Sequence, residues 1–128
     1  MTSSAEAIVR RYLHEVWVLA DAAAVEALLS PEYIDHDPPP GVGGTRTDQR
    51  RAIELLGVAT RDRAIRILTV HACGDFAAVR QDTSWVQVGS LFGLPGDGQR
   101  VLLRVCELYR VSKDRIVESW HVESIARG

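Results

Sequence analysis

Cysteine is scarce in this chain, with Cys73 and Cys106 the only two among 128 residues. They stand far apart, each inside an apolar run, and two thiols cannot supply a disulfide framework or a zinc site. Thiols in such surroundings usually behave as small hydrophobic side chains. We therefore expect neither a disulfide-stabilised fold nor a catalytic cysteine.

An excess of charge of either sign is also lacking. The formal net charge is −2, and acidic and basic residues are interspersed along the chain. This balance lacks the electrostatic footprint of a protein that binds nucleic acid or anionic lipid. No apolar run has the length of a signal peptide or a membrane span. With 46% apolar and 25% charged residues, the chain is typical of one globular cytoplasmic domain spanning residues 1–128.

The first half of the sequence shows helical periodicity. A capping box that begins at Ser3 precedes apolar residues at helical spacing, which predicts a first helix from about Ser4 to Ala20. Asp21 is expected to cap a second, short helix that Pro31 ends. After a loop rich in proline and glycine, Thr47 is expected to cap a third helix.

Beyond Asp62 the period changes from helical to alternating. Four strands are predicted: Ala64–Cys73, Phe76–Val88, Val101–Val111 and Arg115–Ser124. Helices followed by a run of antiparallel strands indicate an α+β domain with three N-terminal helices packed on one face of the sheet. Strands of about ten residues exceed what a flat sheet in so small a domain needs. We therefore expect a strongly curved sheet, a cone-shaped α+β barrel with a pocket inside.

The last predicted strand ends in ionisable residues, although a terminal strand could equally end in threonines and lysines. Alternation places Ser119 and His121 on one face of that strand. If the preceding turn holds three residues, Glu107 shares this face, whereas a turn of two residues would set Glu107 beside Trp120. A carboxylate beside an imidazole on a pocket wall is a proton-transfer unit. A solvent-facing row of charges stays open as the alternative.

Asp35-His36-Asp37 forms a second cluster, on a short extended segment before three prolines. Either His36 points into the cavity from its mouth, or the aspartates only satisfy backbone donors in the turn. No second histidine stands at ligand spacing, so no metal site is expected. Trp85 has polar strand-mates in Gln81 and Thr83, and we expect it to line a ligand site.

Three stretches of the chain, in this order and spacing, resemble the SnoaL-like polyketide cyclases, which share their fold with nuclear transport factor 2, ketosteroid isomerase and scytalone dehydratase. The stretches are Tyr33-Ile34-Asp35-His36-Asp37-Pro38, Phe92-Gly93-Leu94-Pro95 with Gly98, and Asp114-Arg115-Ile116-Val117-Glu118-Ser119-Trp120. The resemblance implies a cone-shaped barrel, a deep apolar pocket, no cofactor, and a homodimer packed through the outer face of the sheet. In these cyclases an aspartate directly after the tryptophan of the last strand is the general acid/base for an aldol closure. This chain has His121 at that position, and Glu107 lies where relatives often place an acidic or imidazole partner.

We therefore predict a cofactor-independent enzyme that moves protons on a small apolar, polyketide-like or polycyclic ligand. His121 is expected to be the general acid/base, Glu107 its orienting partner, and His36 the group that polarises a substrate oxygen. The expected ligand contacts are Tyr12, Trp17, Tyr33, Asp35 and Trp85. A non-catalytic ligand-binding or dimerisation module is one alternative. A hydratase or epoxide-hydrolase-like enzyme, in which a carboxylate pair activates water, is the other.

Overall fold

The computed structural model describes residues 4–127, and its helices lie in the first half of the chain, with one strand, Leu29–Asp35, before the last of them. Their bounds are Ser4–Tyr12 for α1, Leu13–Val18 for the π-helical segment η1 that continues it, Ala22–Leu28 for α2 and Arg46–Ala59 for α3. Each buries one apolar stripe, as Val9, Val25 and Ile53 illustrate, because apolar residues recur at helical spacing. The three-helix expectation is confirmed, with a π-helical end to the first helix.

The caps of these helices agree with the sequence at one place and differ at another. Asp21 caps α2 and accepts a hydrogen bond from the backbone N–H of Ala23, as predicted. The prediction that Thr47 caps α3 is wrong. Thr45 caps the helix instead, in a capping box with Asp48. The box needs an acidic or amide side chain three residues after the cap, and Asp48 stands at that distance from Thr45, whereas Arg50 stands there for Thr47. The capping box expected at Ser3 lies outside the described residues.

Five strands form one sheet in the order β1-β5-β4-β3-β2. Their bounds are Leu29–Asp35 for β1, Thr60–Cys73 for β2, Phe76–Gln87 for β3, Arg100–Ser112 for β4 and Arg115–Arg127 for β5. β2 to β5 form the antiparallel meander that alternation predicts. β1 was expected only as an extended segment, but it pairs in parallel with β5 at the sheet edge.

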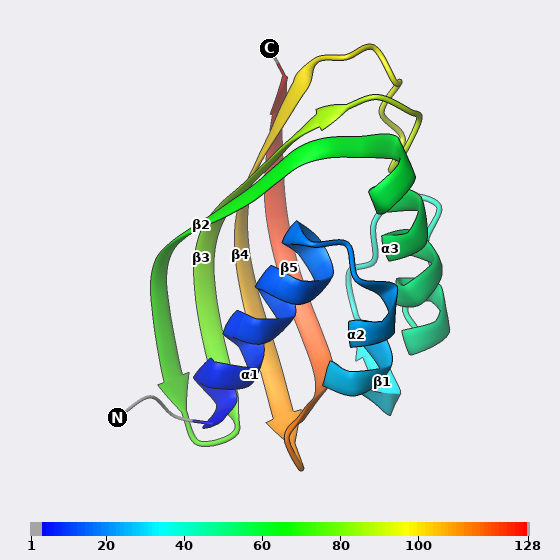
Figure 1. Cartoon of the computed structure of the whole chain (residues 1–128). Coiled ribbons are helices and arrows are strands. Elements are labelled where there is room, and N and C mark those ends of the chain that lie inside the picture. Colours follow the sequence, from blue (N-terminus) through cyan, green and yellow to red (C-terminus); the bar gives the residue numbers. More distant parts are fainter. Residues whose placement is uncertain (1–3, 128) are drawn as a thin grey trace.

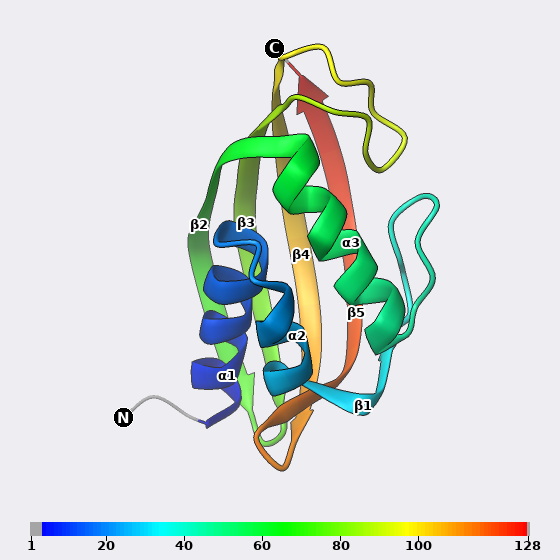
Figure 2. The same ribbon diagram turned by 45° about the vertical axis from the view of Figure 1, so that its right-hand side comes forward.

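The sheet is long and strongly curved, and all the helices lie on its concave side (Figure 1). Viewed from a second direction, α3 crosses in front of β4 and β5, while α1 covers β2 and β3 (Figure 2). The main core lies between these two layers, where Val16, Leu28, Leu56 and Ile116 are almost fully buried. Each such side chain contributes about 1.5–3 kcal/mol to folding relative to an exposed position. The predicted α+β class and curvature are confirmed.

The β4–β5 hairpin differs from the sequence expectation in its turn. Ser112 pairs with Arg115, so the turn holds two residues, Lys113 and Asp114, both with positive φ. If pairing continued without interruption from this two-residue turn, Glu107 would lie beside Trp120. A register shift between Arg110 and Val111 adds one residue to β5, and Glu107 pairs with His121 instead. The predicted face-sharing of Glu107 and His121 is therefore confirmed, through a bulge that alternation does not show.

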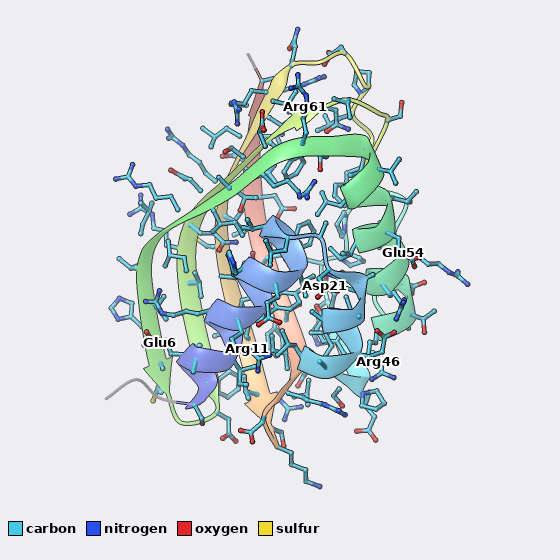
Figure 3. The ribbon with its side chains drawn as sticks, in the orientation of Figure 1. Glu6, Arg11, Asp21, Arg46, Glu54 and Arg61 are labelled. Carbon is cyan, nitrogen blue, oxygen red and sulfur yellow. The ribbon has the colours of Figure 1, made fainter. Side chains whose placement is uncertain are left out.

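Charged side chains cover the outer surfaces of the helices. Figure 3 shows Glu6 and Arg11 on α1 and Glu54 on α3, directed away from the sheet. Arg11 donates to Glu15 one turn further on, at 2.9 Å. Exposed pairs of this kind stabilise a helix by only about 0.3–0.5 kcal/mol. Within residues 4–127, no helix combines the length and apolarity that crossing a bilayer requires.

Candidate active site

A cavity of about 90 Å³ opens on the concave side of the sheet. Helices α1 and α3, strands β1, β3, β4 and β5, and two loops contribute side chains to its wall. Of the residues expected at the site, seven line it: Tyr12, Trp17, Tyr33, Asp35, Trp85, Glu107 and His121. His36 does not.

His121 lies on the cavity wall between two carboxylates. Its Nε2 is 3.2 Å from Oδ2 of Asp35, and its Nδ1 is 2.7 Å from Oε2 of Glu123. The His121 side chain is 13% exposed and that of Asp35 7%. Burial alone would lower the pKa of His121, but the hydrogen bonds to Asp35 and Glu123 outweigh it and raise that pKa to about 10. At neutral pH the ring is thus an imidazolium that donates both N–H groups.

The backbone around Asp35 is held from several directions. Its N–H donates to the carbonyl of Gly44 at 2.8 Å, and its Oδ1 accepts from the N–H of Asp37 at 2.9 Å. Oδ2 of Asp37 in turn accepts from the backbone N–H of His121 at 3.0 Å. Gly44 is required here, because a Cβ at that position would lie 2.5 Å from the carbonyl oxygen of Asp35. The loop before α3 therefore fixes the carboxylate that faces His121.

Glu107 enters the cavity from β4, directly across from His121. Its Oε1 accepts a hydrogen bond from Nε2 of Gln81 at 2.7 Å. Burial raises the pKa of Glu107 to about 8, against the lowering effect of the His121 charge, and the charges of Glu123 and Asp35 add to the rise. Glu107 is therefore mostly a neutral acid at pH 7, and it gains its charge just above neutrality.

A group of hydroxyls forms another polar part of the wall. Tyr12 Oη accepts from Nε2 of Gln49 at 2.6 Å and from Nε1 of Trp17 at 3.0 Å. Its own proton can donate to Tyr33, because a hydrogen bond from Tyr12 is among the effects on the pKa of Tyr33. The π-helical segment η1 brings Trp17 to the same side as Tyr12, five residues earlier. Tyr33 Oη lies 2.7 Å from Oγ of Ser119. Burial raises the pKa of both tyrosines, which keeps them protonated.

The rest of the wall is aromatic and aliphatic. Phe92 packs against Trp17 and Trp85, with ring centroids 6.3 and 6.5 Å apart. Trp85 donates from Nε1 to Oε1 of Gln87 at 2.6 Å, so its ring is fixed in place. Leu103 and further apolar side chains complete this part of the wall. A flat apolar ligand with a few oxygens matches such a lining.

His36 is placed outside the cavity, and the expectation that it points in from the mouth does not hold. Its Nε2 is 2.8 Å from Oε2 of Glu118. Its ring stacks on Trp120, with centroids 4.8 Å apart and planes at 9°. The reason is alternation along the extended chain, because Asp35 faces inward and its neighbour must face outward.

Several cavity residues were not among the site residues predicted from the sequence, although Glu123 is a carboxylate that a water-activating pair with Glu107 would use. Gln81, Ser119 and Glu123 share strand faces with Trp85 and His121, so alternation already placed them there. Gln49 is a buried amide on the apolar side of α3, which is a signal in itself. Among residues 4–127, no group of three or more His, Cys, Asp or Glu side chains is arranged to hold a metal ion.

The SnoaL-like polyketide cyclase family model matches residues 7–126, nearly the whole described chain. The chain belongs to the SnoaL-like polyketide cyclase family. Among solved structures, TsrD from Streptomyces laurentii superposes on this SnoaL-like chain with a TM-score of 0.81 at 21% identity, covering 94% of this chain and 88% of that one. A search of curated proteins finds no match.

Two further structures carry names that refer to chemistry. IdmH from Streptomyces antibioticus, a candidate polyketide cyclase, has a TM-score of 0.74 at 20% identity, covering 95% of this chain and 93% of that one. AclR from Streptomyces galilaeus, a candidate hydroxylase, has a TM-score of 0.75 at 21% identity, covering 94% and 78%. At such identities these structures show that the SnoaL-like fold is shared, and no more.

Proposed function

We propose that this SnoaL-like protein is a cofactor-independent enzyme that moves protons on a polyketide-like or polycyclic ketone, as an aldol cyclase or isomerase does. The observation that supports it most is the pairing of two groups across β4 and β5: a buried carboxyl that ionises near pH 8 and an imidazolium that persists to about pH 10. General acid/base catalysis works best with such groups near the working pH.

The two groups divide the work. The ionised fraction of Glu107 takes a proton from the carbon next to a substrate carbonyl, and the electron pair of the C–H bond forms an enolate. In a cyclase, the enolate carbon then attacks a second carbonyl of the same chain, which forms a C–C bond and an alkoxide. The His121 imidazolium gives its proton to that oxygen, and the proton on Glu107 returns to His121 through solvent.

The surroundings of His121 indicate which N–H the substrate shares. The side chain of Glu123 is 27% exposed, whereas that of Asp35 is 7% exposed. Nδ1–H is therefore the group whose partner a substrate oxygen replaces more easily. Tyr12 supplies a second donor when a substrate oxygen replaces Tyr33 as its partner, because the Tyr12 oxygen already accepts two hydrogen bonds. Trp85 and Phe92, whose ring planes meet at 68°, form an aromatic corner in which a ring system packs.

The hydratase alternative is less well supported by these contacts. Activation of water by a carboxylate pair needs two carboxylates free to accept its protons. Asp35 and Glu123 both bind the His121 ring, and Glu107 is mostly neutral at pH 7. The arrangement therefore favours proton transfer to and from carbon.

A bicyclic ketone, 2-tetralone, tests this proposal without knowledge of the natural substrate. In D₂O buffer at pD 8.5, we expect the wild-type protein to speed deuterium exchange at the carbon between the ring and the carbonyl, as followed by NMR. His121→Gln and Glu107→Gln should each slow the exchange by about 100-fold, the usual share of one acid or base. His14→Gln removes an exposed histidine on η1 and is the matched control.

Binding without exchange would identify a ligand-binding module instead. A thermal shift on addition of 2-tetralone, with no exchange above the buffer rate, is the result for that case. Equal exchange rates in the wild type and both variants would show that the cavity groups do not catalyse.

The outer face of the sheet supports the homodimer that the family resemblance implies. Val122 is 71% exposed there, and Leu108 and Trp120 lie beside it around an open groove of about 380 Å³. Exposed apolar side chains gathered in this way are typical of protein contacts. We propose a dimer through this face. A cytoplasmic location stays a prediction from the sequence.

A further inference from the structure

The segment Asp35-His36-Asp37 contacts β5 on both of its faces. Asp35 reaches the His121 ring on the concave face. His36 lies on the opposite face, bonded to Glu118 and stacked on Trp120. The two contacts are thus made by neighbouring residues to opposite sides of one strand.

Regular pairing between β1 and β5 ends where this segment begins. Ile34 pairs with Glu118 and Asp35 with Ser119, after a register shift that separates them from the pair at Leu29. One further backbone bond joins the strands, from the N–H of His36 to the carbonyl of Ser119, at 2.9 Å. Three prolines, which cannot donate to a ladder, follow directly. Backbone pairing with β5 therefore ends at His36, while on the other side of β1 the N–H of Asp35 is bonded to the carbonyl of Gly44.

The carboxylate of Asp35 must nevertheless reach beyond its own partner on β5, to a ring two residues further on. Side-chain contacts with β5 add to these backbone bonds. Asp37 accepts from the backbone N–H of His121, and His36 covers Trp120, the residue just before His121, with nearly parallel rings. Glu118, the partner of His36, is itself fixed by Arg110 of β4, at 2.6 Å.

We propose that His36 is a positioning residue: by stacking on Trp120 and bonding Glu118 on the outer face, it holds Asp35 against His121 on the inner face. The inference rests on the proposed function for its catalytic meaning. The contact itself does not depend on turnover. Because the His36 side chain is 39% exposed, its hydrogen bond with Glu118 adds little energy, and its effect is geometric.

The ionisation of the His121 ring reports this contact directly. The charged groups that face His121 are Asp35 from β1, Glu107 from β4 and Glu123 from β5, with Asp37 on its backbone. Of these, only the two aspartates belong to the segment that His36 holds. Loss of His36 should therefore weaken the Asp35 contact and leave those of Glu107 and Glu123 in place.

The experiment is a ¹⁵N NMR titration of the histidine rings from pH 5 to 11, with the His121 signals assigned by their absence in His121→Gln. In the wild type we expect the ring to stay protonated past pH 9. His36→Ala should lower the proton affinity of His121 about tenfold, roughly half the worth of one charge-assisted hydrogen bond. His36→Phe keeps the stacking and should lower it only about threefold. Glu32→Ala, at an exposed position of the same strand, should change nothing.

An unchanged His121 titration in a folded His36→Ala protein would overturn the proposal. If that variant does not fold, the comparison of His36→Phe with Glu32→Ala decides, and equal titrations in those two overturn it as well. The proposed function can fail separately. Absence of 2-tetralone exchange in the wild type would refute catalysis while the titration still showed that His36 holds Asp35 in place.

Discussion

Replacement of Glu107 by glutamine should remove a pH-dependent loss of stability. Burial raises the pKa of Glu107 to about 8, from an ordinary value of 4.5. The folded protein therefore holds a proton on this residue in a range where the unfolded chain has released it. Glutamine has the same shape and no charge, and it can still accept a hydrogen bond from Gln81.

The direction and size of this change in the free energy of unfolding follow from proton linkage. A carboxyl whose folded pKa is raised destabilises the fold as pH rises from the unfolded value to the folded value, and the loss is constant above it. At about 1.4 kcal/mol per pH unit, the range from pH 5 to 8 gives about 4 kcal/mol. His121 contributes a further loss, because its raised pKa stabilises the fold below pH 6.5 and this contribution disappears as pH passes 10. Most of that part is common to the wild type and Glu107→Gln, because the hydrogen bonds to Asp35 and Glu123 remain, and only the smaller contribution of the Glu107 charge to the raised His121 pKa is lost in the variant.

Urea unfolding at pH 5 and pH 9, followed by tryptophan fluorescence, measures this difference. The wild type should lose about 4 kcal/mol more than Glu107→Gln between the two pH values. Glu32→Gln, which removes an exposed carboxylate from β1, is the control and should behave as the wild type. If Glu107→Gln and the wild type lose the same free energy of unfolding between the two pH values, Glu107 is not a buried neutral acid. The proposal that Glu107 is the base and His121 the acid would then be wrong.

Three further outcomes are expected. Tyr12→Phe leaves the donors of Gln49 and Trp17 without their acceptor, so thermal unfolding should show a loss of about 1–3 kcal/mol, and no loss would mean that water replaces the hydroxyl. Gly44→Ala should cost about 1–3 kcal/mol because its Cβ would meet the Asp35 carbonyl oxygen, whereas Gly57→Ala in α3 should be neutral or stabilising. Val122→Arg should convert a dimer to a monomer in analytical ultracentrifugation, and a monomeric wild type would contradict the proposed interface.

Most of the fold follows from periodicity in the sequence. Helical spacing before residue 60 and alternation after it are local signals, and they identify the helices and the antiparallel meander. The pairing of β1 with the sheet was not predicted, because its partner strand begins 80 residues later in the sequence. A strand followed by prolines also carries no local sign of parallel pairing. The bulge near Val117 was not predicted either, because alternation of apolar and polar residues does not reveal an inserted residue.

The site was predictable as a set of residues and less so as a set of contacts. Glu107 and His121 are recognisable as ionisable residues on a buried face. Their hydrogen-bond partners are not, because Asp35 and His121 are 86 positions apart. His36 shows most clearly what the sequence leaves undecided. The Asp35-His36-Asp37 motif predicts that His36 lies near the site, but it does not predict to which face of the sheet the His36 side chain points. The inward turn of Asp35 decides that His36 faces outward.

Proton transfer by Glu107 and His121 is tested most directly by the pH dependence of 2-tetralone exchange. The base must be ionised, which requires a pH above about 8, and the imidazolium must persist, which requires a pH below about 10. The exchange rate with the wild-type protein should therefore rise around pH 8, reach its maximum between these values and fall above pH 10. A rate that follows the buffer reaction alone across this range, or that keeps the same profile in Glu107→Gln, would contradict the proposed chemistry.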